Sequence, residues 1–393
     1  MSFQETKSVS WFGRIKRSFG GVLVGLALIV GMVCLLFWNE GRAVQTARSL
    51  AEGAGIVMSI APTVDPAREG DLVHVTAHLF TPLPVADAEF NIEAQGLRLQ
   101  RSVEMFQWVE TSRTETRNKL GGGQEQVTTY SYNMDWSDRA HDSAKFKDPQ
   151  DRQNPQMAIS KATFQAESAT LGGFELDARV LNLVGGARDF PIPADRADAI
   201  QQAVGAGVRA SIINGGIYLG PNPSQPRIGD YRISYRLVPN GMVSVIGRQE
   251  GNGLAPYQTE AGNTLLMVKE GTVSAQEMFD GAASNNTVLT WIARIAGIAL
   301  LIFGFSFVLG PLAVIGDVIP FVGSIVRMGT GVVAWTAGIL VGSATIALAW
   351  FFYRPITALI VLAIGVVLAV VVPRFLKRRP GAKEPGMETV GDA

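Results

Sequence analysis

The sequence predicts a multi-pass α-helical membrane protein with four spans and a large α+β, strand-rich extramembrane domain. The chain of 393 residues has 17% charged residues and a mean hydropathy of +0.21, whereas about 25% charged residues are typical of soluble domains. Long apolar stretches lie near both ends of the chain. The region between them, residues 39–288, contains alternating apolar and polar residues, which favours strands.

The composition excludes several classes of protein. Basic and acidic residues number 34 each, whereas a nucleic-acid-binding protein is expected to have a basic excess. The single cysteine, Cys34, cannot form an internal disulfide, and a cysteine-based zinc site needs more than one thiol. We therefore expect no nucleic-acid partner, no internal disulfide and no cysteine-based zinc site.

The first predicted span is residues 19–38, which follows a predicted cytoplasmic N-terminus, residues 1–18. Residues 20–38 carry no charge, and a helix of this length matches the roughly 30 Å apolar thickness of a bilayer. A cleaved signal peptide is the alternative, because basic residues precede the apolar stretch. The stretch is long for a signal peptide and ends in Trp38-Asn39-Glu40 instead of small residues, which favours an uncleaved anchor.

Residues 39–288 are predicted to form a water-exposed α+β domain. Strands are favoured at residues 72–80, 97–109, 126–136, 231–238 and 242–247. The Asn-Gly pair within residues 239–241 predicts a hairpin between the last two. Residues 193–206 favour a helix, residues 140–155 favour a polar loop, and the three glycines at 121–123 favour a hairpin loop.

Three further spans are predicted at residues 289–309, 330–352 and 355–373. Only Tyr353, Arg354 and Pro355 separate the last two apolar stretches, which predicts an antiparallel helical hairpin with an aromatic and charged tip at the interface. Arg294 lies near the start of its span. We expect its aliphatic stem to let the guanidinium reach the membrane surface.

Residues 310–329 are predicted to be a re-entrant or interfacial segment on the cytoplasmic side. They are apolar but contain two prolines, several glycines and Asp317, and a lipid-facing helix broken in this way would expose unpaired backbone groups. Basic residues near the first span and in residues 374–393, a predicted cytoplasmic tail, indicate that both termini are cytoplasmic. An even number of spans follows, with residues 39–288 in a bacterial periplasm or a eukaryotic lumen.

Two stretches of the sequence resemble a known family. Residues 10–53 contain SWFGRIKRSFGG and, just beyond the first span, NEGRAV at residues 39–44; residues 294–355 contain LIFGFSFVLGPLAVIGDVIPFVG and LAWFFYRP. Both are similar to the transmembrane protein 43 family, also called LUMA, and NEGRAV is the most specific part. YSYNMDW at residues 130–136 extends the resemblance into the middle of the chain.

The resemblance implies one N-terminal span, a large luminal or periplasmic domain and three C-terminal spans. It also implies self-association and a non-enzymatic role in organising protein complexes. In animals the family is placed at the inner nuclear membrane and endoplasmic reticulum, with emerin and lamins as associates. The Ala- and Gly-rich composition indicates a bacterial member, for which we expect the inner membrane and other membrane partners, of unknown identity.

No catalytic, cofactor-binding or metal site is predicted. His74 and His78 lie four residues apart in a predicted strand and would face the same side, as two metal ligands can. The third histidine, His141, lies in the polar loop, and no cysteine or paired carboxylate accompanies the pair, which favours ordinary strand histidines. The chain also contains no GxSxG, HExxH or phosphate-loop motif.

Asp317 is the candidate intramembrane polar site. An ionisable group at membrane depth is by default a functional hypothesis, as a proton or ion relay or as a partner in a helix pair. The alternative is that Asp317 lies at the cytoplasmic headgroup level, where an acid costs little.

The motif Asn39, Glu40, Gly41 and Arg42 is predicted at the outer membrane interface. Glu40 and Arg42 either pair with the tip of the C-terminal hairpin, Tyr353 and Arg354, or remain solvated beside an aromatic belt. Both alternatives place these residues at the boundary of lipid and water.

Small residues at four-residue spacing are predicted to mediate helix packing, because they let helix backbones approach closely in lipid. These residues are Gly21, Gly25, Ala334, Gly338 and Gly342. Packing between subunits would make a homo-oligomer, and packing within one subunit would use the same faces.

The leading functional hypothesis is a non-enzymatic membrane scaffold that self-associates and organises protein complexes. The alternative is an oligomeric channel or transporter that uses residues 310–326, because interrupted helices also occur at transport sites. A membrane-tethered hydrolase is the third hypothesis, and it would need an acid–base cluster within residues 39–288.

Overall fold

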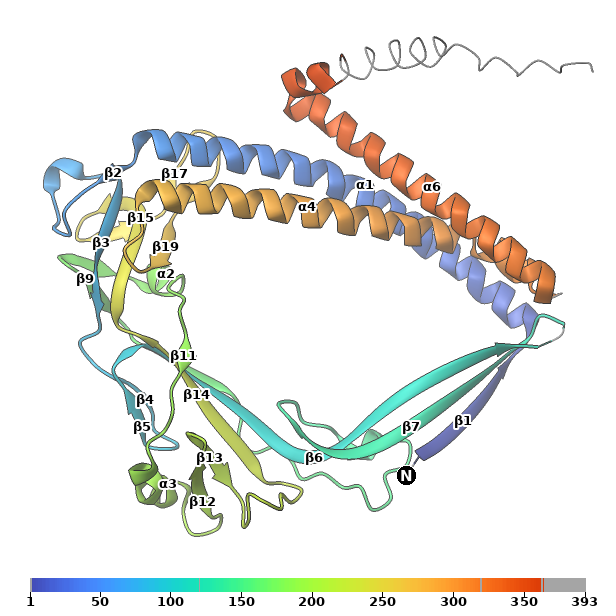
Figure 1. Ribbon diagram of the computed structural model, residues 1–393, viewed down its shortest axis with the longest axis horizontal. Helices are drawn as coiled ribbons and strands as arrows, with labels where there is room; N and C mark the ends of the chain where they lie inside the picture. Colours follow the sequence, from blue (N-terminus) through green and yellow to red (C-terminus); the bar gives the residue numbers. More distant parts are fainter. Residues whose placement is uncertain (1, 120, 319, 362, 364–393) are drawn as a thin grey trace, which may run out of the picture.

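The computed structural model describes residues 2–119, 121–318, 320–361 and 363. Three long helices lie along one side of the molecule, and the strands make up the other side (Figure 1). A ribbon of strands runs from the strand-rich region back to the N-terminal end of the first helix (Figure 1). Helices and strands therefore meet at both ends of the molecule.

The long helices are α1 (Trp11–Ile56), α4 (Ala275–Val308) and α6 (Pro320–Tyr353), and the short ones are α2 (Ala178–Leu181), α3 (Ala197–Val204) and α5 (Gly310–Gly316). Within the described residues, three helical stretches are long and apolar enough to cross a membrane: Trp11–Ile56, Ala275–Val308 and Gly323–Tyr353. They contain the predicted spans 19–38 and 330–352, and the predicted span 289–309 up to residue 308. The fourth predicted span, 355–373, lies largely outside the described residues, and the tail 374–393 lies wholly outside them.

The first two spans are parts of longer helices. α1 begins after Ser10, whose hydroxyl accepts a hydrogen bond from the Gly13 N–H, and its 46 residues rise by about 69 Å. α4 begins with a capping box of Ser274 and Glu277. Residues 39 and 288 therefore do not mark helix ends. Both helices continue into the strand-rich region, because Leu50 and Phe279 are buried in its hydrophobic contacts.

The predicted re-entrant segment, residues 310–329, is divided between two helices. α5 carries Pro311 in its first turn, and α6 begins at Pro320. A proline in the first helical turn lacks only an N–H that would have no partner within the helix. These prolines therefore mark where helices start, and α6 continues without interruption through the predicted third span.

The strands form two main sheets. The first has the order β1 (Ser2–Val9), β7 (Gln124–Ser137), β6 (Gly96–Asn118), β14 (Tyr231–Pro239), β13 (Gly216–Leu219), β12 (Ala210–Ile213), with β8 (Ala162–Gln165) on β6 and β11 (Arg188–Asp189) on β14. The second has the order β19 (Met267–Glu270), β15 (Gly241–Glu250), β16 (Gly253–Ala255), β10 (Phe174–Leu176), β9 (Ala169–Leu171), β3 (Leu72–Phe80), β2 (Met58–Ser59). Two small pairs are β4 (Val85–Asp87) with β5 (Ile92–Ala94), and β17 (Tyr257–Gln258) with β18 (Thr264–Leu265).

Most of the predicted secondary structure is confirmed. The five predicted strands are β3, β6, β7, β14 and β15. The predicted helix at 193–206 is a 3-10 turn, Ala194–Arg196, followed by α3. The predicted polar loop at 140–155 is irregular apart from one 3-10 turn, Ser143–Lys145.

The predicted hairpin at residues 239–241 is wrong. β14 pairs with β6 and β13, whereas β15 pairs with β3, β16 and β19 in the other sheet. A two-residue hairpin turn needs a positive φ, and neither Asn240 nor Gly241 has one. The Asn240 amide instead lies within hydrogen-bond distance of the Thr81 hydroxyl, at 3.1 and 3.2 Å. The chain therefore crosses here from one sheet to the other.

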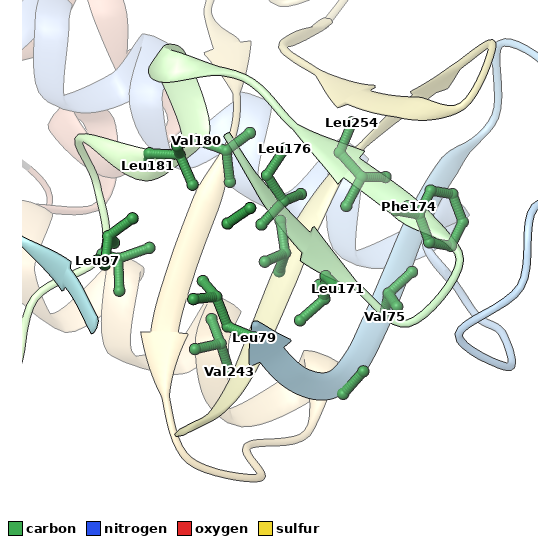
Figure 2. Packing of buried hydrophobic residues seen from close by; sticks show 14 of the residues in the cluster. Val75, Leu79, Leu97, Leu171, Phe174, Leu176, Val180, Leu181, Val243 and Leu254 are labelled. Atoms are coloured by element: carbon green, nitrogen blue, oxygen red, sulfur yellow. The ribbon is translucent and has the colours of Figure 1, made fainter. Parts of the chain in front are cut away.

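The core of the second sheet follows from the alternation of its strands. Val73, Val75 and Leu79 of β3 are fully buried, because every second side chain of a strand faces the same side. Figure 2 shows Leu79 beside Val243, and Val75 near Leu171 of β9; all four belong to one hydrophobic cluster. This core fixes the strand-rich region into which α1 and α4 extend.

The N-terminal strand joins the first sheet. β6 and β7 form a long hairpin that pairs Met105 with Ser137, and its loop contains the three glycines, as predicted. β1 pairs along β7 from Ser2 to Val9. Residues 2–9, predicted as part of a separate N-terminal segment, are thus in the same sheet as the region predicted on the opposite side of the membrane. A pairing this distant in sequence leaves no local signal.

Candidate functional site

Three long helices meet at the carboxylate of Glu40. Its two oxygens accept hydrogen bonds from Arg294 of α4, Nε at 2.6 Å and Nη2 at 2.8 Å, and the indole Nε1 of Trp350 in α6 donates at 2.9 Å. Glu40 is 0% exposed and Arg294 is 8% exposed. A bidentate arginine–carboxylate pair is among the stronger ion-pair geometries, so this contact ties α1, α4 and α6 together.

Aromatic rings cover the cation of this pair. The Arg294 guanidinium lies 4.8 Å from the Trp291 ring centroid and 5.6 Å from that of Trp350, within range of cation–π attraction. We call Glu40, Arg294, Trp291 and Trp350 the Glu40 cluster. Glu40 thus binds Arg294 of the neighbouring helix and not Arg354. That Arg294 reaches the membrane surface stays a prediction.

The rest of the predicted interface motif packs against the same helices. Arg42 donates to Asn39, Asn286 and Thr290, each at 3.2 Å. The Asn39 amide donates to the Thr290 carbonyl at 3.3 Å. The motif therefore joins α1 to α4 through hydrogen bonds. The two predicted alternatives, pairing with the hairpin tip or exposure to solvent, did not include these partners.

Gly41 allows α1 to approach the end of α6. A Cβ atom at this position would lie 2.7 Å from Cζ of Tyr353, a distance that real Cβ contacts do not reach. The prediction paired Glu40 and Arg42 with Tyr353 and Arg354, whereas Gly41 is the residue of the motif that lies against Tyr353.

A second carboxylate is buried near the other end of α1. Asp317 Oδ2 lies 2.5 Å from Nη2 of Arg14, and Oδ1 lies 2.5 Å from Nη2 of Arg327. We call these three residues the Asp317 cluster. Asp317 is 2% exposed, so in this structure it is a buried, ion-paired acid; its depth in the membrane stays a prediction. Asp317 is an ion-pair partner of two helices.

The Asp317 cluster also holds the tip of the β6–β7 hairpin. Nη1 of Arg14 donates to the Gly122 carbonyl at 2.5 Å. Nearby, the Trp11 indole donates to the Val314 carbonyl of α5 at 3.1 Å, and a Cβ on Gly122 would lie 2.4 Å from the Trp11 ring. This end of α1 is therefore in contact with the helices and with the ribbon.

The predicted small residues pack within the chain. A Cβ on Gly25 would lie 2.6 Å from the Gly304 carbonyl oxygen, so α1 and α4 cross here with their backbones close. Gly338 and Gly342 of α6 lie against Ile302 and Ile298 of α4. Ala334 is fully buried, and Gly21 faces Phe307 of α4. The faces of Gly25, Ala334, Gly338 and Gly342 are thus occupied inside one subunit.

The histidines take part in ordinary hydrogen bonds. His74 is within hydrogen-bond distance of the Val273 carbonyl and the Ser59 hydroxyl, at 2.9 and 3.1 Å, and His141 lies 3.1 Å from the Ser137 hydroxyl. His78 is exposed on β3. In the part of the chain that the structure describes, no three metal-ligating side chains lie together.

The strand-rich region contains its own buried ion pair, which no motif in the sequence indicates. Asp87 accepts from Nη1 of Arg101 at 2.9 Å and from the Tyr235 hydroxyl at 2.8 Å. Burial and the hydrogen bond to Asp87 raise the pKa of Tyr235 well above its ordinary value. All three groups are inaccessible to a substrate, so they stabilise the fold.

An open groove lies on the outer face of the first sheet. It has a volume of about 780 Å³, and charged side chains of both signs line it, including Glu104, Asp189 and Arg232. The Arg232 guanidinium stacks over Trp136 at 4.0 Å from the ring centroid. Such a mixed surface can recognise a polar partner.

Comparisons with known proteins match most of the amino-acid sequence. The model of the family Transmembrane protein 43 matches residues 105–355. The human and mouse proteins named Transmembrane protein 43 are each 32% identical to this chain, over 90% of both chains for human and 88% of both for mouse. The Transmembrane protein 43 homolog of Drosophila melanogaster is 30% identical over 72% of this chain and 75% of its own. No solved structure matches. The chain therefore belongs to the transmembrane protein 43 family.

Proposed function

We propose that this protein is a non-enzymatic integral membrane scaffold that self-associates and organises other membrane proteins. The long helices anchor it, and the strand-rich region carries the surface that binds partners. Family membership and the three apolar helices support the membrane location. The scaffold role and self-association are our inference.

The observation that supports this proposal is the ion pairing of buried charged residues in the helices. Glu40 and Asp317 are buried and ion-paired, so both carboxylates hold helices together in this structure. Their ion pairs join helices to each other and to the ribbon. Helices fixed in this way suit an anchor that holds a domain in place.

The ion pairing of Asp317 also gives no support to the channel or transporter alternative. That hypothesis relied on an interrupted helix at residues 310–326 and on Asp317 as a free polar group. In the structure the segment is divided between α5 and α6, and Asp317, which follows α5, has two arginine partners. No observation specifically favours a pathway through this segment.

We also propose that both termini face the cytoplasm, with the part of β7 that pairs with β1 on that side, and that the bacterial inner membrane is the location. The basic residues before the first span support this orientation, because basic residues are enriched in cytoplasmic segments. In eukaryotic relatives the corresponding location would be the inner nuclear membrane and endoplasmic reticulum.

The scaffold proposal is tested by crosslinking the intact chain in its native membrane and identifying the captured neighbours by mass spectrometry. We expect crosslinks between copies of the chain and to a reproducible set of membrane proteins. Arg232→Gln in the groove should lose those neighbours. The matched control is Arg113→Gln, which removes the same charge from the exposed part of β6 and should keep them.

Two results would contradict the proposal. One is a chain recovered alone and as a single copy, or with neighbours that both variants retain equally. The other is ion or solute flux in vesicles containing the purified protein, abolished by Asp317→Asn.

A further inference from the structure

An apolar groove with a basic rim lies at the N-terminal end of α1. It has a volume of about 740 Å³ and is lined by residues of α1, α4, α5, β1 and β7. Along α1, the lining runs from Arg14 and Arg17 to Gly20, Gly21 and Val24, and Phe307 of α4 faces them. We propose that this groove binds an anionic phospholipid, with its phosphate at Arg17 and its acyl chains against the apolar part.

The groove has a polar end and an apolar end, as a lipid molecule has. Arg17 precedes the uncharged stretch 20–38, and Val24 lies within it. Seven residues of helix separate them, a rise of about 10 Å. A headgroup phosphate at Arg17 would therefore place the glycerol and the first acyl carbons against Gly21, Val24 and Phe307, at the depth where the bilayer itself becomes apolar.

Two glycines of α1, Gly20 and Gly21, line the groove. A Cβ atom on Gly20 would meet nothing within 4 Å, and one on Gly21 would meet only Phe307, at 4.0 Å. The space is thus open to a ligand along α1. Since the groove opens toward the apolar segment of a membrane helix, lipid is the molecule present there at high concentration.

The charges at the rim select an anionic headgroup. The neighbouring Asp317 cluster has two arginines and one carboxylate, so it has an excess positive charge. Within the described part of the chain, Arg17 has no ion-pair partner. Basic pockets between membrane helices are suited to anionic headgroups, and the trimethylammonium of phosphatidylcholine would meet like charge here.

The test uses the purified full-length chain in detergent micelles, titrated with phosphatidylglycerol or with phosphatidylcholine of the same acyl chains. Native mass spectrometry counts the lipid molecules that stay bound. We expect one phosphatidylglycerol to bind at least about tenfold more tightly than phosphatidylcholine, which corresponds to about 1.4 kcal/mol.

Two pairs of variants separate the site from general surface charge. Arg17→Gln should weaken phosphatidylglycerol binding about tenfold, whereas Lys16→Gln removes the same charge from an exposed neighbour outside the groove and should change it less than about twofold. Gly20→Leu should fill the groove and weaken binding without any change of charge. Gly31→Leu, also in open space on α1, is its control.

The variants are chosen to fold, because Arg17 has no ion-pair partner in the described residues and both glycines face open space. An unchanged elution volume in size-exclusion chromatography checks this. Equal effects of Arg17→Gln and Lys16→Gln, or no preference for phosphatidylglycerol, would overturn the proposal. So would a Gly20→Leu variant that binds lipid normally but dissociates into single chains, since a second copy would then occupy the groove.

Discussion

The Glu40 cluster and the Asp317 cluster are both built on a buried carboxylate with arginine partners, and they lie near opposite ends of the first apolar span. Arg14 and Glu40 are 26 positions apart on α1, a rise of about 39 Å. A bilayer with its headgroups is about 40–45 Å thick. The rise between the two clusters along α1 is therefore close to the thickness of a bilayer.

Their compositions differ in a way that separates two tasks. The Glu40 cluster has one carboxylate, one arginine and two indole rings, and all its members belong to α1, α4 and α6. The Asp317 cluster has two arginines for one carboxylate and also binds the hairpin tip at Gly122. The first fixes helix to helix. The second couples the helices to the ribbon and leaves an excess positive charge.

The largest expected effect is the loss of the carboxylate in the enclosed cluster. Glu40→Leu leaves the buried Arg294 without a counter-charge, and removing one member of a buried ion pair typically costs about 3–5 kcal/mol. Denaturant unfolding of the purified full-length protein in micelles measures the change. The double variant Glu40→Leu/Arg294→Met should recover most of the loss, because an apolar pair can replace a buried ion pair. A single variant as stable as the double one would refute this account.

Asp317→Asn should have a smaller effect on stability, about 1–3 kcal/mol. The side chain of Arg327 is 53% exposed, so water can partly solvate the charge that loses its partner. Hydrogen exchange should become faster in the hairpin tip around Gly122 and stay unchanged around Glu40. Asp138→Asn, at an exposed position, is the control. Equal acceleration at both clusters would show that they are not independent.

Tyr235→Phe tests the buried carboxylate outside the helices and should cost about 1 kcal/mol, because Asp87 keeps its bond to Arg101. The folded state raises the pKa of Tyr235, through burial first and then the bond to Asp87. Stability is therefore fully present below the unfolded pKa of about 10 and falls as pH rises above it. The variant should lose less stability than wild type in that alkaline range. Parallel curves would rule out Tyr235 as the source.

A cysteine accessibility experiment should leave stability almost unchanged and shows which end of the helices the ribbon reaches. In a Cys34→Ser background, which removes the single cysteine, Thr6→Cys and Lys119→Cys should react with a membrane-impermeant maleimide from the same side. We expect labelling from the same side because β1 pairs with β7 beside the hairpin tip. Labelling from opposite sides would separate the ribbon from the end of α1.

Much of the fold was predictable because its signals are local. Uncharged stretches long enough for a bilayer identify three helices, and alternation identifies β3, β6, β7, β14 and β15. The hairpin at residues 239–241 was predicted wrongly because Asn-Gly is a local signal, and the partners of β14 and β15 are distant strands. The continuation of α1 to Ile56 was missed because the apolar stretch ends at Trp38 while the helix does not.

The sequence by itself determined which stretches are apolar enough to cross a bilayer, since that depends on the hydrophobicity of consecutive residues. It also marked Glu40, Arg294 and Asp317 as charges in unusual places. Only the tertiary structure decided that Glu40 binds Arg294, that Asp317 binds Arg14 and Arg327, and that β1 joins the sheet. A buried charge is stabilised by whichever opposite charge the packing of distant segments brings within hydrogen-bond distance, and spacing along the chain does not contain that information.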